Sequence, residues 1–106
     1  MLAMLLCLWH ASAQDPMVLQ YYTNLSDGTT IALPLYGAVN VTVDWGDGTT
    51  NTYPTEGVHE HTYATHGQYT VFITGSLQQF GASSTVPGND KLQAVTSFGN
   101  LGLSSL

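Results

Sequence analysis

The chain has 106 residues, about the length of one globular domain, and Lys91 is its only lysine or arginine, so its formal net charge is −6. A chain of this length can bury a single hydrophobic core. Because it lacks a basic patch, it has nothing to neutralise nucleic-acid phosphates or anionic headgroups of a membrane surface. Nucleic-acid binding and membrane-surface binding are therefore not expected.

The first segment has the features of an export signal. An apolar run over residues 2–9 is followed by Ala11 and Ala13, small residues at positions −3 and −1 of a cleavage after Ala13. A membrane span needs about 20 apolar residues, more than this run supplies. We expect residues 1–13 to be a signal peptide, the protein to be secreted or at the cell surface, and no membrane insertion after signal removal. The alternative is an apolar strand or helix of the domain itself.

Beyond Pro16 the sequence predicts β-structure. Turn residues recur at roughly the 8–12-residue spacing of a sandwich, and no segment keeps a helical apolar period. We therefore expect an all-β, Ig-like β-sandwich of about seven strands. Pro34 has no N–H donor, so its strand should end there or lie at an edge. The expected strands are residues 17–23, 29–35, 39–45, 49–53, 59–63 and 69–75, and residues 91–98 resume a strand-like alternation after a loop.

The clearest pattern lies in residues 39–45, where valines alternate with polar residues up to Trp45. Such alternation gives one buried face and one solvated face. Gly46 and Gly48 can supply the positive φ angles of a tight hairpin, and Asp47 between them can accept hydrogen bonds from the turn. Trp45 is thus predicted to be a core residue placed directly before a chain reversal.

Asp44 and Asp47 form a close pair of carboxylates, and three interpretations stay open. The pair can stabilise the turn, which is the favoured interpretation. Together with Asn51 and backbone carbonyls it could supply the oxygen ligands of calcium. Acid–base catalysis is disfavoured because the hairpin shows no sign of a cleft. No metal and no cofactor are therefore expected, with calcium as the alternative.

Histidines near the middle of the chain raise the question of a zinc site. His59 and His61 alternate along one expected strand and so share a face, but two ligands do not complete a zinc site, and His66 would have to fold back from a turn. No serine lies in a Gly-x-Ser-x-Gly motif, and no glycine-rich phosphate loop precedes a lysine. The chain is predicted not to be an enzyme.

Three short motifs follow one another in the middle third of the chain. They are Asp44-Trp45-Gly46-Asp47-Gly48-Thr49, His61-Thr62-Tyr63 and Gly67-x-Tyr69-x-Val71. In order and spacing they resemble the polycystic kidney disease (PKD) repeat family, although many members carry Trp-x-Phe before the Gly-Asp-Gly. The resemblance implies a PKD-like sandwich over residues 14–80. Its structural motif would comprise Trp45, Gly46, Asp47, Gly48, His61, Tyr63, Gly67, Tyr69 and Val71, with Tyr63 and Tyr69 placed as in a tyrosine corner.

The tail carries a second, weaker pattern. Lys91-Leu92 through Phe98-Gly99-Asn100 resembles the lead-in to the leucine-rich repeats of BspA-like bacterial surface proteins. Residues 81–106 are interpreted as a linker and the start of such repeats, because Leu101, Leu103 and Leu106 need a neighbouring layer to bury them. The resemblance implies that downstream domains of the same polypeptide are partners of this piece.

These features predict a non-catalytic extracellular module of a bacterial surface protein. It would act as a spacer or bind extracellular protein or carbohydrate, and Tyr21, Tyr22, Tyr36 and Tyr53 are candidates for a binding surface, although half-buried packing is favoured for each. The alternative is an accessory PKD module of a secreted glycosidase or peptidase. A fold alone does not choose between these functions.

Overall fold

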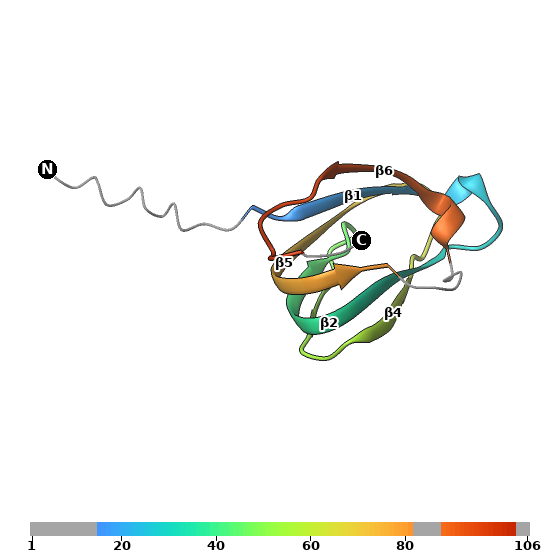
Figure 1. Ribbon diagram of the computed structural model, residues 1–106. Coiled ribbons are helices and arrows are strands. Elements are labelled where there is room, and N and C mark those ends of the chain that lie inside the picture. Colours follow the sequence, from blue (N-terminus) through green and yellow to red (C-terminus); the bar gives the residue numbers. More distant parts are fainter. Residues whose placement is uncertain (1–14, 82–87, 104–106) are drawn as a thin grey trace, which may run out of the picture.

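The computed structural model describes residues 15–81 and 88–103, and this part of the chain is all-β (Figure 1). The predicted all-β, Ig-like sandwich is confirmed, with six strands in place of about seven. The expected signal peptide, residues 1–13, lies outside the described residues. The elements in chain order are β1 Met17–Tyr22, the 3-10 helix η1 Thr23–Leu25, β2 Thr30–Asp44, β3 Thr50–Tyr53, β4 Gly57–Thr62, β5 Gln68–Phe80, the 3-10 helix η2 Asn89–Lys91 and β6 Leu92–Ser97.

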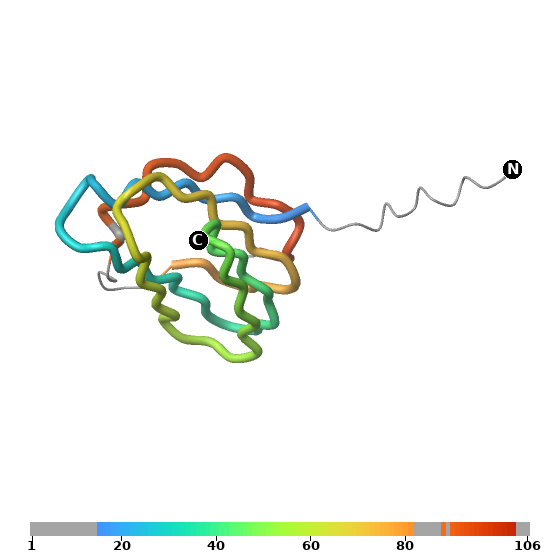
Figure 2. The backbone as a smooth tube through the Cα atoms, turned by 180° about the vertical axis from the view of Figure 1, so that it is seen from behind, coloured from blue at the N-terminus to red at the C-terminus, as the bar shows by residue number. Residues whose placement is uncertain are grey.

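All six strands belong to one antiparallel sheet that folds over a core. The strand order is β3-β2-β5-β1-β6, and β4 pairs with the first half of β2. In Figure 1, β1 and β6 lie on one side of the core, and β2 with β4 lies on the other. Strands β1 and β6 run side by side although most of the chain separates them in sequence (Figure 2). The sheet therefore provides both layers of the sandwich.

Strand β2 is one long strand where the sequence predicted two. The pairing of β2 with β5 shifts register between Tyr36 and Val39, and Gly37 there has a φ of 77°. A bulge of this kind bends a strand without ending it, which carries β2 from one layer towards the other. The residues that looked like a turn are this bulge, so the two predicted strands at residues 29–35 and 39–45 are halves of β2.

Pro34 does not end β2. Its carbonyl accepts a hydrogen bond of 2.9 Å from the N–H of Gly81, just past the end of β5 at Phe80. The N–H and C=O of a strand residue point to the same side. An N–H at position 34 would therefore point towards the end of β5, away from β4. For this reason the pairing of β2 with β4 loses no hydrogen bond to the proline.

The core is built from alternate residues of the long strands, as the period-two pattern predicts. Val41, Val43 and Ile73 are fully or almost fully buried. Trp45 and Tyr63 are the largest of the fully buried side chains. The core cluster consists of Met17, Leu19, Tyr21, Ile31, Leu33, Leu35, Val39, Val41, Val43, Trp45, Tyr63, Val71, Ile73, Leu77 and Leu101.

The sandwich extends past residue 80, where the sequence analysis placed its end. Strand β6 pairs with β1, Leu101 is buried in the core, and its carbonyl accepts a 3.0 Å hydrogen bond from the N–H of Leu77. Leu103 packs against the same core, and Leu106 lies outside the described residues. Leu101 and Leu103 therefore find their burying layer in the sandwich itself, without the repeat array that their spacing suggested.

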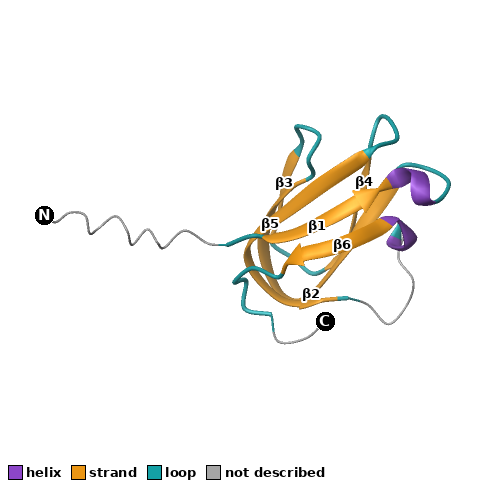
Figure 3. Cartoon of the chain, turned by 90° about the horizontal axis from the view of Figure 1, so that it is seen from above, coloured by secondary structure: helices purple, strands orange, loops and turns teal. Residues whose placement is uncertain are grey.

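The single cation of the chain is buried at one end of the sandwich, where η1 and η2 lie side by side (Figure 3). Lys91 is 2% exposed. Its Nζ donates to the carbonyl oxygens of Thr23 (3.0 Å), Ser26 (2.7 Å) and Asp27 (2.8 Å) and to Ser26 Oγ (2.6 Å). A buried charge is tolerated when its hydrogen-bonding capacity is filled in this way. The ammonium ties the start of β6 to the loop after β1.

Replacing Lys91 by Met should lower the free energy of unfolding by about 3 kcal/mol, because each buried oxygen left without its donor costs roughly 1–3 kcal/mol. Urea denaturation followed by circular dichroism measures the change. Thr96→Met, at an exposed position of the same strand β6, is the matched control and should leave the midpoint nearly unchanged. A Lys91→Met chain as stable as the parent would contradict a structural role for the ammonium.

Candidate functional site

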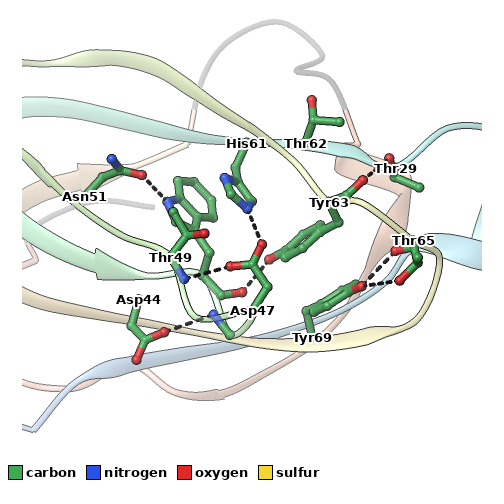
Figure 4. A network of polar contacts seen from close by, with 12 residues as sticks. Thr29, Asp44, Asp47, Thr49, Asn51, His61, Thr62, Tyr63, Thr65 and Tyr69 are labelled. Atoms are coloured by element: carbon green, nitrogen blue, oxygen red, sulfur yellow. Dashed lines mark hydrogen bonds and ion pairs between the residues drawn. The ribbon is translucent and has the colours of Figure 1, made fainter.

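Motif residues from distant parts of the sequence, among them Asp47, His61 and Tyr63, lie close together beside the turn between β2 and β3 (Figure 4). The N–H of Trp45 donates to the carbonyl of Thr49 at 3.0 Å, which closes the turn. Gly46 has a φ of 85°, and a Cβ on it would collide with the carbonyl oxygen of Thr70 on β5. Both the backbone conformation and the close approach therefore require glycine at this position. Gly48, with a φ of 91°, completes the reversal.

The indole of Trp45 is held by both its ring and its polar edge. Its ring stacks on that of His61, with centroids 4.6 Å apart and planes 11° from parallel. Its Nε1 donates to Asn51 Oδ1 at 2.8 Å, which satisfies the one polar atom of a fully buried side chain. The Trp45 carbonyl accepts a 2.6 Å hydrogen bond from Tyr63 Oη. Strand β3, through Asn51, and strand β4, through His61, thus hold the ring, while Tyr63 holds the backbone of Trp45.

Asp47 links the turn to β4. Its Oδ1 accepts the N–H of Thr49 at 3.0 Å, and its Oδ2 lies 2.8 Å from His61 Nε2. A carboxylate only accepts hydrogen bonds, so the hydrogen is on His61 Nε2. Burial by itself would raise the pKa of the Asp47 carboxyl, but the hydrogen bonds from His61 and Thr49 outweigh it and hold that pKa below its usual value.

A ladder of stacked rings follows β4. Its alternate residues His59 and His61, with Tyr63 just beyond the strand, share one face. Each stacks on a ring from elsewhere in the chain. The pairs are His59 on Tyr53 (4.0 Å, 20°), His61 on Trp45 (4.6 Å, 11°) and Tyr63 on Tyr69 (3.7 Å, 8°). Strands β3 and β4 each pair with β2 and not with each other. The side-chain stacks therefore close an edge that backbone hydrogen bonds leave open.

Tyr63 and Tyr69 anchor the turn before β5. Tyr69 Oη donates to the carbonyl of Thr65, four residues upstream, at 2.7 Å, which is the geometry of a tyrosine corner. Burial, with a smaller effect from the negative charge of Asp47, raises the pKa of the Tyr63 phenol, so the phenol stays a hydrogen-bond donor.

The remaining motif residues, Gly67 and Val71, have structural contacts of their own. The carbonyl of Gly67 accepts the Thr23 N–H at 3.0 Å, and the N–H of Gly67 donates to Thr23 Oγ1 at 2.9 Å. Val71 is fully buried.

The calcium candidates do not converge on one point. Asp44 lies opposite Thr50, and Asn51 lies opposite Val43, so the side chains of Asp44 and Asn51 point to opposite faces of the β2–β3 ribbon. Asp44 Oδ1 accepts the N–H of Gly46, Asn51 Oδ1 accepts from the indole, and both oxygens of Asp47 accept bonds. Calcium binding stays a hypothesis for which the structure provides no formed set of three ligands.

The histidines considered for zinc are held apart in different contacts. His59 Nε2 lies 3.0 Å from the carbonyl of Thr55, whereas His66 Nδ1 lies 3.0 Å from Thr23 Oγ1. Across residues 15–81 and 88–103, no three side chains of His, Cys, Asp or Glu gather in a way that could hold a metal ion. The alternation of His59, His61 and Tyr63 was readable in the sequence, but it marks a stacking face.

Comparisons with protein families, curated proteins and solved structures found no match to this chain. In the described part of the chain, no helix is long and apolar enough to span a membrane. The site must therefore be interpreted from its own geometry. Asn51, predicted only as a calcium candidate, accepts the hydrogen bond of the indole, and no local pattern in the sequence indicates which residue meets Nε1.

Trp45→Ala should lower the free energy of unfolding by about 3–5 kcal/mol, because it removes a large core side chain and leaves a cavity. Urea denaturation followed by circular dichroism measures the loss. Phe72→Ala removes an aromatic ring that is 39% exposed and serves as the control, with an expected change under about 1 kcal/mol. An unchanged midpoint for Trp45→Ala would show that the indole does not organise the core.

Asp47→Asn should destabilise the protein in a pH-dependent manner. The folded-state pKa of Asp47 lies below its ordinary value of about 3.9, so the ionised carboxylate stabilises the fold above that pH and loses its effect as the pH falls through the lowered pKa. The difference in unfolding midpoint between parent and variant should be largest near pH 7 and shrink below about pH 4. Asp44→Asn, which removes a carboxylate of the same turn without a histidine contact, is the matched control for the loss of one negative charge. A difference that does not vary with pH would contradict the role given to the Asp47 carboxylate.

Proposed function

We propose that this chain is a non-catalytic extracellular module of a bacterial surface protein. In this proposal it is a PKD-like sandwich that serves as a spacer or binds extracellular protein or carbohydrate. The observation that carries the proposal is that the reactive-looking side chains of the motif form contacts within the fold. The family assignment rests on the three motifs around Trp45, His61 and Tyr69.

The Asp47–His61 pair supports a structural role over a catalytic one. The two side chains are 21% and 13% exposed, and the His61 ring is enclosed by the stack on Trp45 and by an edge contact with Tyr63 at 4.7 Å. A general base needs access to the proton that it removes. An open recess elsewhere on the surface is lined by Gln20, Gln68, Tyr69 and Thr70, and it contains neither a carboxylate nor a histidine.

The positions of the two ends favour a displayed module over a link in a straight line. The N–H of Asp15 donates to Asn100 Oδ1 at 2.9 Å, and the N–H of Asn100 donates to the Asp15 carbonyl at 3.2 Å. The start of β1 and the end of β6 therefore lie at the same end of the sandwich. A module attached there presents its strands and its other end to the surroundings, which suits binding better than spacing.

Export is the part of the proposal that is tested most directly. The full chain, produced in a bacterial host with a C-terminal tag, should leave the cytoplasm and begin at Gln14, as mass spectrometry of the exported product would show. Ala13→Phe places a bulky residue at the −1 position and should block cleavage, whereas Ser12→Phe changes the tolerant −2 position and should be processed as the parent is. A parent chain that stays inside the cell with residue 1 intact would overturn the extracellular assignment.

A further inference from the structure

The outer face of the sheet carries a row of side chains that crosses four strands. Paired residues of neighbouring strands share a face. The pairings Thr50–Asp44, Asp44–Phe72 and Phe72–Val18 therefore place one row across β3, β2, β5 and β1. The residues that alternate with these, such as Val43 and Ile73, point into the core. We name the surface around this row the Phe72 face.

Phe72 is the large apolar side chain at the centre of this face. Phe72 makes the outer face of β5 apolar as well, since Val71 and Ile73 on the same strand already point into the core. Strand β5 is central, but Phe72 remains 39% exposed, and its neighbour Val18 is half-buried. Covering the exposed part of this ring would be favourable. Nothing in residues 15–81 and 88–103 covers it more fully, so this favourable contact is left for a partner.

Short hydroxyl and amide side chains surround the ring. A second row consists of Thr52, Thr42 and Thr74, and on the other side of Phe72 lie Thr70 and Gln20. Hydroxyl and amide groups both donate and accept hydrogen bonds. Among the threonines, Thr42 and Thr52 are joined only by a long 3.4 Å contact between their Oγ1 atoms. The face therefore offers both donors and acceptors at short intervals.

The charge of the face narrows the class of partner. The chain carries a formal net charge of −6, yet Asp44 is the only charged residue in these rows. One Asp44 oxygen, Oδ1, accepts the N–H of Gly46, and the other can accept from a ligand hydroxyl. An anionic ligand would be repelled by the acidic chain, and a cationic ligand would meet a single carboxylate on this face. The charge distribution fits a neutral partner.

The chemistry of the Phe72 face fits a sugar better than a protein as its partner. Large contiguous apolar patches on a protein surface mark protein–protein interaction sites, whereas the apolar part here consists of Phe72 and Val18. A neutral sugar ring has C–H groups on its faces and hydroxyls around its rim. Positively polarised C–H groups suit the negative face of an aromatic ring, and rim hydroxyls suit the threonine, glutamine and aspartate side chains.

We propose that the Phe72 face binds a neutral, extended polysaccharide, with one sugar ring against Phe72 and flanking hydroxyls bonded to Asp44 and the neighbouring threonines. This inference rests on the extracellular function proposed above and specifies its ligand. Neighbouring strands lie about 4.8 Å apart, so the row from Thr50 to Val18 spans roughly 14 Å. An oligosaccharide of several units should therefore bind more tightly than a single sugar.

The test is retention of the purified full-length chain by defined polysaccharides. The neutral probes are insoluble cellulose and chitin, and soluble xylan and mannan in affinity electrophoresis, with alginate as the anionic probe. At least one neutral probe should retain the parent, and Phe72→Ala should weaken that retention about tenfold or more, as removal of a central aromatic contact does. Thr42→Val, which removes one hydroxyl at nearly constant volume, should weaken it by a smaller factor.

Val58→Ala is the matched control. Val58 is also 39% exposed, but it lies on β4 outside the Phe72 face, so this variant should bind as the parent does. Melting curves that coincide for parent, Phe72→Ala and Val58→Ala would show that each variant is folded. Binding to none of the neutral probes, binding to alginate alone, undiminished binding by Phe72→Ala or equal loss with Val58→Ala would each overturn the inference. An exported chain that binds no probe would overturn this inference and leave the proposed function standing, whereas a chain retained in the cell would overturn the proposed function.

Discussion

The rest of the structure depends on burying one indole at a point where the chain reverses. Trp45 can be buried there only if its Nε1 finds an acceptor and the chain turns immediately after it, and Asn51 and Gly46 meet these two needs. The ring face then positions His61, and His61 in turn binds Asp47 of the same turn. Because these contacts share atoms, the hairpin, β4 and the turn before β5 stabilise one another as a unit.

The sandwich is held at its margins by side chains where backbone pairing ends. At one edge, the stacks of His59 on Tyr53 and His61 on Trp45 join β4 to the β2–β3 hairpin. At the end where the two 3-10 helices meet, the Lys91 ammonium gathers carbonyl oxygens of the loop after β1. A sheet that folds over itself without closing has open edges, and exposed edges invite unwanted pairing. The ladder of stacked rings joins β4 to the hairpin at the open edge, and the buried lysine fixes the loop after β1 to the start of β6.

The side chains inside the sandwich and those on its outer face differ in what they contact. Asp47, His61 and Tyr63 complete one another's hydrogen bonds and ring contacts, so they support a scaffold. On the outer face, in contrast, the Phe72 ring stays exposed among threonines, while the core on the other side of the sheet is packed. A rigid sheet holds such side chains at fixed spacing, which lowers the entropy lost when a ligand binds. The interior thus provides the rigidity that the proposed binding surface would need.

The sequence by itself determined the all-β class, the alternation of buried and exposed residues in the second half of β2, the hairpin after Trp45 and the burial of its ring. These features follow from period-two patterning and from glycines that permit positive φ, which are properties of neighbouring residues. Only the tertiary structure decided that Gly37 bends one strand and does not separate two, that β6 joins the sandwich, and that Asp44 and Asn51 point to opposite faces. Lys91 meets its carbonyl partners 64 to 68 residues away, and the exposure of Phe72 depends on what the other strands leave uncovered. Such contacts depend on how distant segments are brought together, so no local sequence pattern predicts them.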